Sequence, residues 1–260
     1  MIKIGDEEIF YTDTGGDKPA LLFVHGIAMD HSVWKHQIEA FRTDYRVVSV
    51  DLRGYGQSTA ASPDITFEQH AADLAALIDA LDLKNVVLVG WSMGGAIAQV
   101  FAAAHGSKLS RLVLVATTPQ LLADDKFGDA LPAAAAQQLG AMFMDDYTNG
   151  MAAFFGMVAP EDQRVVAMLT EIAAASRPDV VLTAFKTSGE RSQLDLLARI
   201  KVPTAVIAGR EDAICFPAAN TYLAKHIAGS KGAAAFIDAG HAPFLTRPDA
   251  FNAVLRAALS

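Results

Sequence analysis

One serine stands where its hydroxyl can act as a nucleophile. Ser92 is the centre of a Gly-Trp-Ser-Met-Gly run at 90–94, which follows the apolar run 86–89 and precedes an Ala-rich stretch. Four apolar residues without polar alternation are typical of a strand covered on both faces. A strand that turns at once into a helix needs small flanking residues, and it exposes the serine at the positive end of the helix. The pattern predicts a serine positioned to attack a carbonyl carbon.

A nucleophilic serine needs a base to take its proton and an acid to orient that base. In open α/β sheets, such groups lie in loops at the carboxyl ends of strands. Asp212 follows the apolar run 202–208, and His241 follows the apolar run 233–237. Ser92, Asp212 and His241 are therefore the predicted nucleophile, acid and base.

Other side chains compete for these roles. Glu211 has a longer side chain and lies one position nearer its strand, and Asp238 is too close to His241 in sequence to reach the ring from across the site. Thr117 and Thr118 occupy the end of an earlier strand, where a carboxylate would be an alternative acid. Asp212 is the favoured choice. Cys215 is interpreted as a packing residue.

Two backbone N–H groups are expected to bind the oxyanion of a tetrahedral intermediate. Met93 directly follows the nucleophile, and Ile27 lies on the loop after the apolar run 20–24. The histidine just before that loop, His25, is interpreted as structural. Trp91, which precedes the serine, is expected to shape the acyl pocket together with Met93.

The elements that carry these residues alternate between strands and helices. A capping-box pattern at 66–69 opens a helix with buried positions at helical spacing. Alternating strands and helices imply a mostly parallel central sheet with helices on both faces, an α/β fold. The predicted strands are Glu8–Tyr11, Ala20–Val24, Arg46–Asp51, Val86–Val89, Arg111–Val115, Val202–Ala208 and Ala233–Ile237.

The alternation of strands and helices is interrupted from residue 119 to residue 199, where the chain is expected to be helical. We interpret 119–199 as a helical cap, or lid, inserted in a core made of 1–118 and 200–260. Phe143 and Phe154 are expected to line an apolar, substrate-binding pocket over the serine.

Composition limits the partners. The net charge of −8 does not attract nucleic acid or anionic membrane surfaces, so the expected partner is a small molecule. No apolar run is long enough to span a bilayer, no signal peptide is visible, and a lone cysteine fits a reducing compartment, so a cytoplasmic location is expected. His31, His36 and His70 lack the spacing of metal ligands, and we expect no metal and no cofactor.

The chain resembles the α/β-hydrolase superfamily over essentially its full length. The landmarks are the His-Gly pair at 25–26, the Asp-Leu-Arg-Gly-Tyr-Gly-Gln-Ser run at 51–58, the serine motif, the Gly-Arg-Glu-Asp run at 209–212 and the Gly-His pair at 240–241. The order serine, acid, histidine also matches. A serine nucleophile distinguishes the chain from haloalkane dehalogenases and epoxide hydrolases, which resemble this fold but use an aspartate.

Within that superfamily, Gly-Trp-Ser at 90–92 and His-Ala-Pro-Phe at 241–244 resemble carboxylesterases that cleave the methyl ester of pimeloyl-acyl carrier protein. This resemblance implies an acyl carrier protein as a partner, held by basic residues of the cap. Acidic residues outnumber basic ones in that segment, which weakens the implication. The basic residues considered are Lys126, Arg164, Arg177, Lys186 and Arg191.

The function expected from the sequence is hydrolysis of a carboxylic ester with a small to medium acyl group through an acyl-enzyme. Lactonases such as 3-oxoadipate enol-lactonase, carbon–carbon bond hydrolases and cofactor-free haloperoxidases share the triad and stay open as alternatives. A ligand receptor on the same fold, with negligible turnover, is an alternative of a different class.

Overall fold

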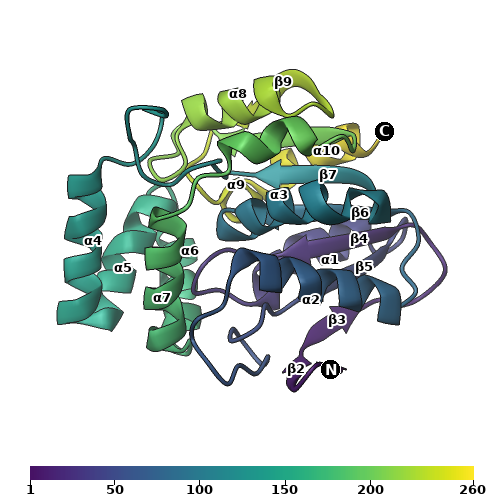
Figure 1. Cartoon of the computed structure of the whole chain (residues 1–260), viewed down its shortest axis with the longest axis horizontal. Coiled ribbons are helices and arrows are strands. Elements are labelled where there is room, and N and C mark those ends of the chain that lie inside the picture. The colour runs from purple at the N-terminus through teal and green to yellow at the C-terminus, as the bar shows by residue number, and fades with distance from the viewer.

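A computed structural model describes all 260 residues, and a seven-stranded sheet lies at its centre (Figure 1). The strand order is β3-β5-β4-β6-β7-β8-β9, and every pair is parallel except β3 with β5. This is the mostly parallel sheet that the alternating pattern predicts. The strands are β3 Tyr11–Asp13, β4 Ala20–Val24, β5 Arg46–Val50, β6 Val86–Trp91, β7 Leu109–Val115, β8 Thr204–Gly209 and β9 Ser230–Ile237.

The first predicted strand, Glu8–Tyr11, is wrong as a single element. A separate two-stranded sheet pairs β1 (Ile2–Ile4) with β2 (Glu7–Ile9), and the chain then moves to β3 in the main sheet. Phe10 lies at the break, where its N–H donates to Ser58 Oγ at 2.8 Å and its carbonyl accepts from Asp51 N–H at 2.9 Å. The first bond joins Phe10 to a neighbouring loop, and the second continues the β3–β5 pairing one residue beyond the two strands.

Helices cover both faces of the sheet. On one face α2 packs on α3, which contacts β6 and β7, while α1 packs on α10 and α10 contacts β8 and β9 (Figure 1). As predicted, Thr66 caps α2, because its Oγ accepts from Gln69 N–H at 3.1 Å. The core helices are α1 Lys35–Phe41, α2 Phe67–Ala80, α3 Met93–His105, α8 Pro217–His226, α9 Pro243–Thr246 and α10 Pro248–Leu259, with short 3-10 turns η1 His31–Trp34, η2 Gly106–Lys108 and η3 Leu194–Arg199.

The core follows the central strands. Every residue of β4 and β6 is buried, and these strands belong to one hydrophobic cluster of 70 buried residues. Burial on both faces explains why these strands read as continuous apolar runs rather than alternating ones. Such strands hold their carboxyl ends, and the loops that follow them, in fixed positions.

Four helices separate β7 from β8: α4 Ala133–Asp145, α5 Tyr147–Val158, α6 Gln163–Ala174 and α7 Pro178–Gly189. They form a group at one end of the sheet (Figure 1). The two segments that connect this group to the core lie against each other, since Gln120 bridges Ser192 and Gln193 N–H donates to Pro119 O at 2.8 Å. None of the helices has the length and apolar character needed to cross a membrane.

Candidate active site

Ser92 occupies a strained turn between β6 and α3. Its φ of 55° and ψ of −119° lie outside the regions that residues with a side chain ordinarily adopt. A Cβ at position 90 would lie 2.4 Å from Gly94 O, and a Cβ at position 94 would lie 2.3 Å from His25 O, so both positions require glycine. The turn is held by Ser92 N–H donating to Val115 O at 3.0 Å and by Thr117 Oγ1 donating to Ser92 O at 2.8 Å. Strain of this kind costs roughly 1–3 kcal/mol and is typical of functional sites.

A chain of two hydrogen bonds connects Ser92 to a carboxylate. Ser92 Oγ lies 2.9 Å from His241 Nε2, and His241 Nδ1 lies 2.8 Å from Asp212 Oδ2. Because Asp212 accepts at Nδ1, that nitrogen carries the proton and Nε2 is left to accept from the serine hydroxyl. The histidine and the aspartate are 1% and 3% exposed. The structure thus brings together three residues that lie far apart in the sequence.

The second oxygen of Asp212 is also hydrogen-bonded. Its Oδ1 accepts from Ile214 N–H at 2.8 Å and from Cys215 N–H at 2.9 Å, which fixes the orientation of the carboxylate. The two competing acids lie elsewhere. Glu211 is exposed, and Asp238 is exposed and accepts from Arg210 Nε at 2.8 Å.

The loop that carries His241 is tied to two parts of the chain. His241 N–H donates to Val158 O at 2.8 Å, and Gly240 N–H donates to Glu161 Oε1 at 2.9 Å, both at the end of α5. Trp91 Nε1–H donates to His241 O at 2.8 Å. The helices between β7 and β8 therefore contribute to the position of the histidine, which no sequence signal indicated.

A pocket opens beside Ser92. It is lined mainly by apolar side chains, and Ile27 and Met93 lie in its wall together with the serine. Phe154 of α5 lines it as expected, and Phe185 of α7, which the sequence did not single out, does so as well. The full lining is Ile27, Phe67, Ser92, Met93, Ala96, Thr117, Thr118, Pro119, Gln120, Leu121, Phe154, Phe185, Ser188, Arg191, Gln193, Ile214 and Cys215.

Two residues expected at the pocket do not line it, which corrects the sequence prediction. Trp91 is buried behind the turn, where its ring packs edge-on against Phe244. Phe143 stands behind the wall, with its ring centroid 6.0 Å from Phe154 and 4.8 Å from Phe185. Both side chains support lining or catalytic residues from behind.

The two backbone N–H groups expected to bind an oxyanion belong to residues of the pocket wall. Met93 is the first residue of α3, so its N–H has no acceptor within the helix. Ile27 lies on the loop after β4 and is followed by Ala28, whose φ is 60°. A Cβ on Gly26 would lie 3.1 Å from the Trp91 ring and 3.3 Å from Ser92 Cβ. This loop therefore approaches the serine closely because residue 26 has no side chain.

His25 has a structural role, as predicted. Its Nδ1 lies 2.7 Å from Gly26 O, and its Nε2 accepts from Leu52 N–H at 3.0 Å. Burial lowers the pKa of His25, so the ring is neutral near pH 7 and Nδ1–H is the donor to Gly26. The ring links the loop after β4 to the loop after β5.

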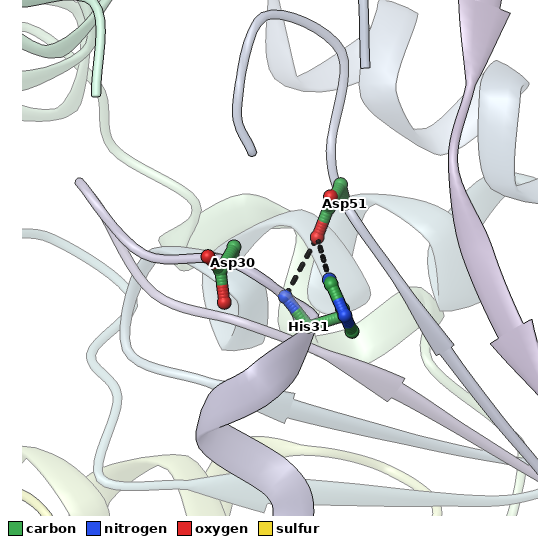
Figure 2. A group of neighbouring side chains, drawn as sticks. All are labelled: Asp30, His31 and Asp51. Atoms are coloured by element: carbon green, nitrogen blue, oxygen red, sulfur yellow. Dashed lines mark hydrogen bonds and ion pairs between the residues drawn. The ribbon is translucent and has the colours of Figure 1, made fainter. Parts of the chain in front are cut away.

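A second cluster has the residue types of a metal site. Asp30, His31 and Asp51 lie together after β4 and β5 (Figure 2). Asp51 Oδ1 accepts from His31 N–H at 2.7 Å and from His31 Nδ1 at 2.8 Å, and its Oδ2 accepts from Gln57 N–H at 2.8 Å. Asp30 Oδ1 accepts from Ser32 N–H at 2.8 Å. These donors occupy both oxygens of Asp51 and one oxygen of Asp30, and the bonds between His31 and Asp51 join the loop after β4 to the loop after β5.

Comparison with known proteins identifies the family. A family model described as the alpha/beta hydrolase fold matches residues 19–248. A pimeloyl-[acyl-carrier protein] methyl ester esterase of Vibrio cholerae is 32% identical over 93% of this chain and 94% of its own length. Karrikin insensitive 2 receptor IA of Petunia hybrida is 26% identical over 93% of this chain and 90% of its own.

A solved structure supports the same fold. An esterase from Exiguobacterium antarcticum superposes with a TM-score of 0.91 at 23% identity, covering 98% of this chain and 96% of its own. The mostly parallel sheet, the Gly-x-Ser-x-Gly turn and the full-length relatives agree with one another. The chain belongs to the α/β-hydrolase family.

Proposed function

We propose that this protein hydrolyses carboxylic esters of small to medium acyl groups through an acyl-enzyme on Ser92. The observation that carries the proposal is the hydrogen-bonded chain from Ser92 Oγ to His241 (2.9 Å) and on to Asp212 (2.8 Å), with the serine on a strained turn beside an apolar pocket. With the acid and the base buried and the serine beside the pocket, the three aligned groups support nucleophilic acyl transfer.

The reaction proceeds in two steps. Ser92 Oγ attacks the acyl carbon while His241 Nε2 takes the hydroxyl proton, and Asp212 stabilises the imidazolium through Nδ1–H. The backbone N–H groups of Ile27 and Met93 bind the oxyanion, and His241 then gives its proton to the departing alcohol. A water, deprotonated by His241, then attacks the acyl carbon, the bond to Ser92 Oγ breaks, and His241 returns the proton to that oxygen as the acid leaves. The chain's own groups supply every proton transfer, so the proposal calls for no metal or cofactor.

The helices between β7 and β8 act as a cap in this proposal. Residues 119–199 would form a lid on a core of 1–118 and 200–260, with Phe154 and Phe185 over the acyl group. Water exclusion by such a lid strengthens the electrostatic interactions at the oxyanion. The bonds from the His241 loop to Val158 and Glu161 couple this lid to the base.

A carrier-bound pimelate methyl ester is a specific candidate substrate, because a relative that is 32% identical is named for that activity. The charge on the helices between β7 and β8 supports a carrier partner only weakly. Arg164, Arg177 and Arg191 are each paired with an acidic side chain, namely Asp162, Asp179 and Glu68. If the carrier contributes to binding, the carrier-linked methyl ester will be hydrolysed with a much lower KM than free pimelate methyl esters. Equal KM values would remove the carrier from the proposal.

A receptor with negligible turnover is the alternative of another class, and a receptor among the relatives favours keeping it in the test. Steady-state hydrolysis of aryl esters, methyl esters and lactones of graded acyl length separates the two. The enzyme proposal expects many turnovers per molecule and their loss in Ser92→Ala. Binding of these compounds with at most one turnover would favour the receptor, and a preference for lactones over all open esters would make the protein a lactonase.

A further inference from the structure

A carboxylate holds the residue that precedes the proposed base. Gly240 N–H donates to Glu161 Oε1 at 2.9 Å, and this bond joins residues that lie 79 positions apart in the sequence. It is the only hydrogen bond of the Glu161 carboxylate, whose second oxygen, Oε2, is buried without a partner. Carboxylates in proteins are ordinarily exposed to water or fully paired, so this orientation requires an explanation.

The turn that carries Glu161 is fixed at both ends. Val158 is the last residue of α5, and Gln163 is the first residue of α6. Asp162 N–H donates to Ala159 O at 3.1 Å, which closes the turn, and the side chain of Asp162 caps α6. Glu161 therefore projects from a short, closed turn rather than from a free loop, and its carboxylate follows the position of α5.

This turn lies directly against the residue before the base. A Cβ on Gly240 would lie 2.8 Å from Val158 O and 3.1 Å from both Pro160 Cδ and Glu161 Oε2. Val158 O also accepts from His241 N–H at 2.8 Å. Two consecutive backbone N–H groups, those of residues 240 and 241, thus donate to the end of α5 and to the turn that follows it.

The backbone at His241 determines where its ring lies. Asp212 holds Nδ1 at 2.8 Å, and Nε2 lies 2.9 Å from Ser92 Oγ. A general base has to stay within hydrogen-bond distance of the hydroxyl whose proton it takes, and a misplacement of about 1 Å can cost roughly a hundredfold in rate. Fixing the backbone on the N-terminal side of His241 restricts the ring to this alignment.

We propose that Glu161 is a positioning residue for the reaction: by binding Gly240 N–H, it keeps the His241 ring aligned with Ser92. Glu161 does not line the pocket, so its effect is on kcat rather than on KM. The inference rests on the proposed esterase function and adds to it a side chain that acts on turnover through the base.

The competing explanation is a purely structural bond, one that only attaches the helices between β7 and β8 to the core. In that case, loss of the bond lowers the free energy of unfolding, and the molecules that stay folded turn over like the wild type. Positioning predicts instead that the folded molecules are themselves slower. The kcat of folded protein and a signal from the His241 ring separate the two explanations.

The kinetic test compares three substitutions at position 161. Glu161→Ala removes the acceptor, and kcat for an aryl ester, per folded molecule, is expected to fall roughly ten- to a hundredfold with KM almost unchanged. Glu161→Gln keeps an oxygen that can accept from Gly240 N–H, and it should recover most of that loss. Glu161→Leu removes the acceptor but fills the space, and it replaces the alanine variant if that variant does not fold. Circular dichroism and urea unfolding give the folded fraction.

Asp146→Ala is the matched control. Asp146 caps the other end of α5, where its Oδ1 accepts from Asn149 N–H at 3.0 Å, so this variant also removes a bond from a carboxylate to a backbone N–H. It should lower the free energy of unfolding without changing kcat. Equal falls of kcat in Asp146→Ala and Glu161→Ala would mean that any loosening of these helices slows turnover, which would overturn the specific role of Glu161.

Proton NMR measures the alignment of the ring without a substrate. The proton on His241 Nδ1 lies in a 2.8 Å bond to the buried carboxylate of Asp212, and a charge-assisted bond of this kind moves the proton signal downfield. Labelling the histidines with ¹⁵N assigns the signal. It should shift or broaden in Glu161→Ala and stay in place in Glu161→Gln and Asp146→Ala.

The outcomes that would overturn the inference are specific. An unchanged kcat in folded Glu161→Ala would do so, and so would a fall in kcat with the His241 signal in place, because the effect would then not act through the ring. Failure of Glu161→Gln to recover kcat would also contradict a role for the accepting oxygen.

Failure of the esterase proposal gives a different result. If the wild type hydrolyses no ester, the esterase proposal is removed and the His241 signal alone tests the inference. A shifted signal in Glu161→Ala would then preserve the positioning role, and an unchanged signal would remove it as well.

Discussion

Two aspartate–histidine pairs in this molecule have the same contact distance and different surroundings. Asp212 lies 2.8 Å from His241, and Asp51 lies 2.8 Å from His31. Both aspartates follow strands of the main sheet, and both also accept from backbone N–H groups. The second nitrogen of His241 lies 2.9 Å from Ser92 Oγ, whereas the serine beside the other pair, Ser32, donates to Asp30 instead.

The two pairs differ in the serine that lies beside each histidine. Ser92 is held on a strained turn beside a pocket, at the start of an α-helix of thirteen residues. Ser32 lies within a short 3-10 turn that Asp30 caps. An aspartate–histidine pair alone therefore indicates no chemistry. The serine, its turn and its pocket make one pair a candidate site, while the other joins two loops.

Removing the two serines should produce the largest contrast. Ser92→Ala is expected to lower kcat for ester hydrolysis by about a millionfold, because it removes the nucleophile of the acyl-enzyme. Ser32→Ala removes only a hydrogen bond to Asp30 and should leave kcat unchanged. Steady-state kinetics on an aryl ester measures both. Comparable losses in the two variants would mean that the serine hydroxyl at position 92 has no special role.

Neutralising Asp212 and Asp51 should give the next largest difference in kcat between the two pairs. Asp212→Asn should lower kcat about ten-thousandfold, since an amide in this place favours the wrong tautomer of His241. When only the folded fractions of variant and wild type are compared, Asp51→Asn should change kcat less than tenfold. The same kinetics, with circular dichroism to confirm folding, provides the readout. A larger loss in Asp51→Asn would show that the loop pair takes part in catalysis.

The carbonyl groups of the two histidines allow a finer test. Trp91 Nε1–H donates to His241 O at 2.8 Å, and Ser49 Oγ donates to His31 O at 3.0 Å. Trp91→Phe should lower kcat roughly tenfold with little change in KM, because it loosens the base without altering the pocket wall. Ser49→Ala should leave both constants unchanged. A rise in KM at constant kcat would place Trp91 in substrate binding, as the sequence had suggested.

We expect the Asp51–His31 pair to contribute to the free energy of unfolding rather than to kcat. Burial raises the pKa of Asp51, but the hydrogen bond from the His31 ring, the nearby His25 and the backbone N–H groups of Gln57 and His31 together hold that pKa below its usual range. The bond between the two side chains also raises the pKa of His31. The aspartate contribution is lost as pH falls through the lowered pKa, and the histidine contribution is lost as pH rises through the raised one.

The free energy of unfolding lost in Asp51→Asn should therefore be largest between about pH 4 and pH 6.5, the reference values of the two groups, and smaller at pH 9. Urea unfolding of wild type and variant at several pH values measures this difference. His31→Gln should abolish the decline toward pH 9. A loss that grows steadily with pH would contradict the ionised pair.

Much of this arrangement could be predicted from sequence because the catalytic candidates directly follow apolar strand runs. Ser92, Asp212 and His241 each come within a few residues of the end of a strand of the same sheet, and parallel strands bring their carboxyl ends together. The glycines at 90 and 94 were predictable for the same reason, since a strand that turns into a helix brings backbone atoms close.

The pocket wall could not be predicted in the same way. Which face of α4 or α7 meets the site depends on how helices pack on one another, so Phe143 was expected in the wall and Phe185 was not. Gln120 and Gln193 enter the wall because two connecting segments, distant in sequence, pair with each other. Local periodicity contains neither kind of information.

The central claim is that Ser92 becomes acylated. Rapid acid quenching of the protein with a chromogenic ester, followed by peptide mass spectrometry, tests it directly. The account predicts that the acyl mass is found on the peptide containing Ser92, is absent in Ser92→Ala, and accumulates far more slowly in Asp212→Asn. An acyl group on another residue, or ester turnover with no acylated peptide at any quench time, would contradict it.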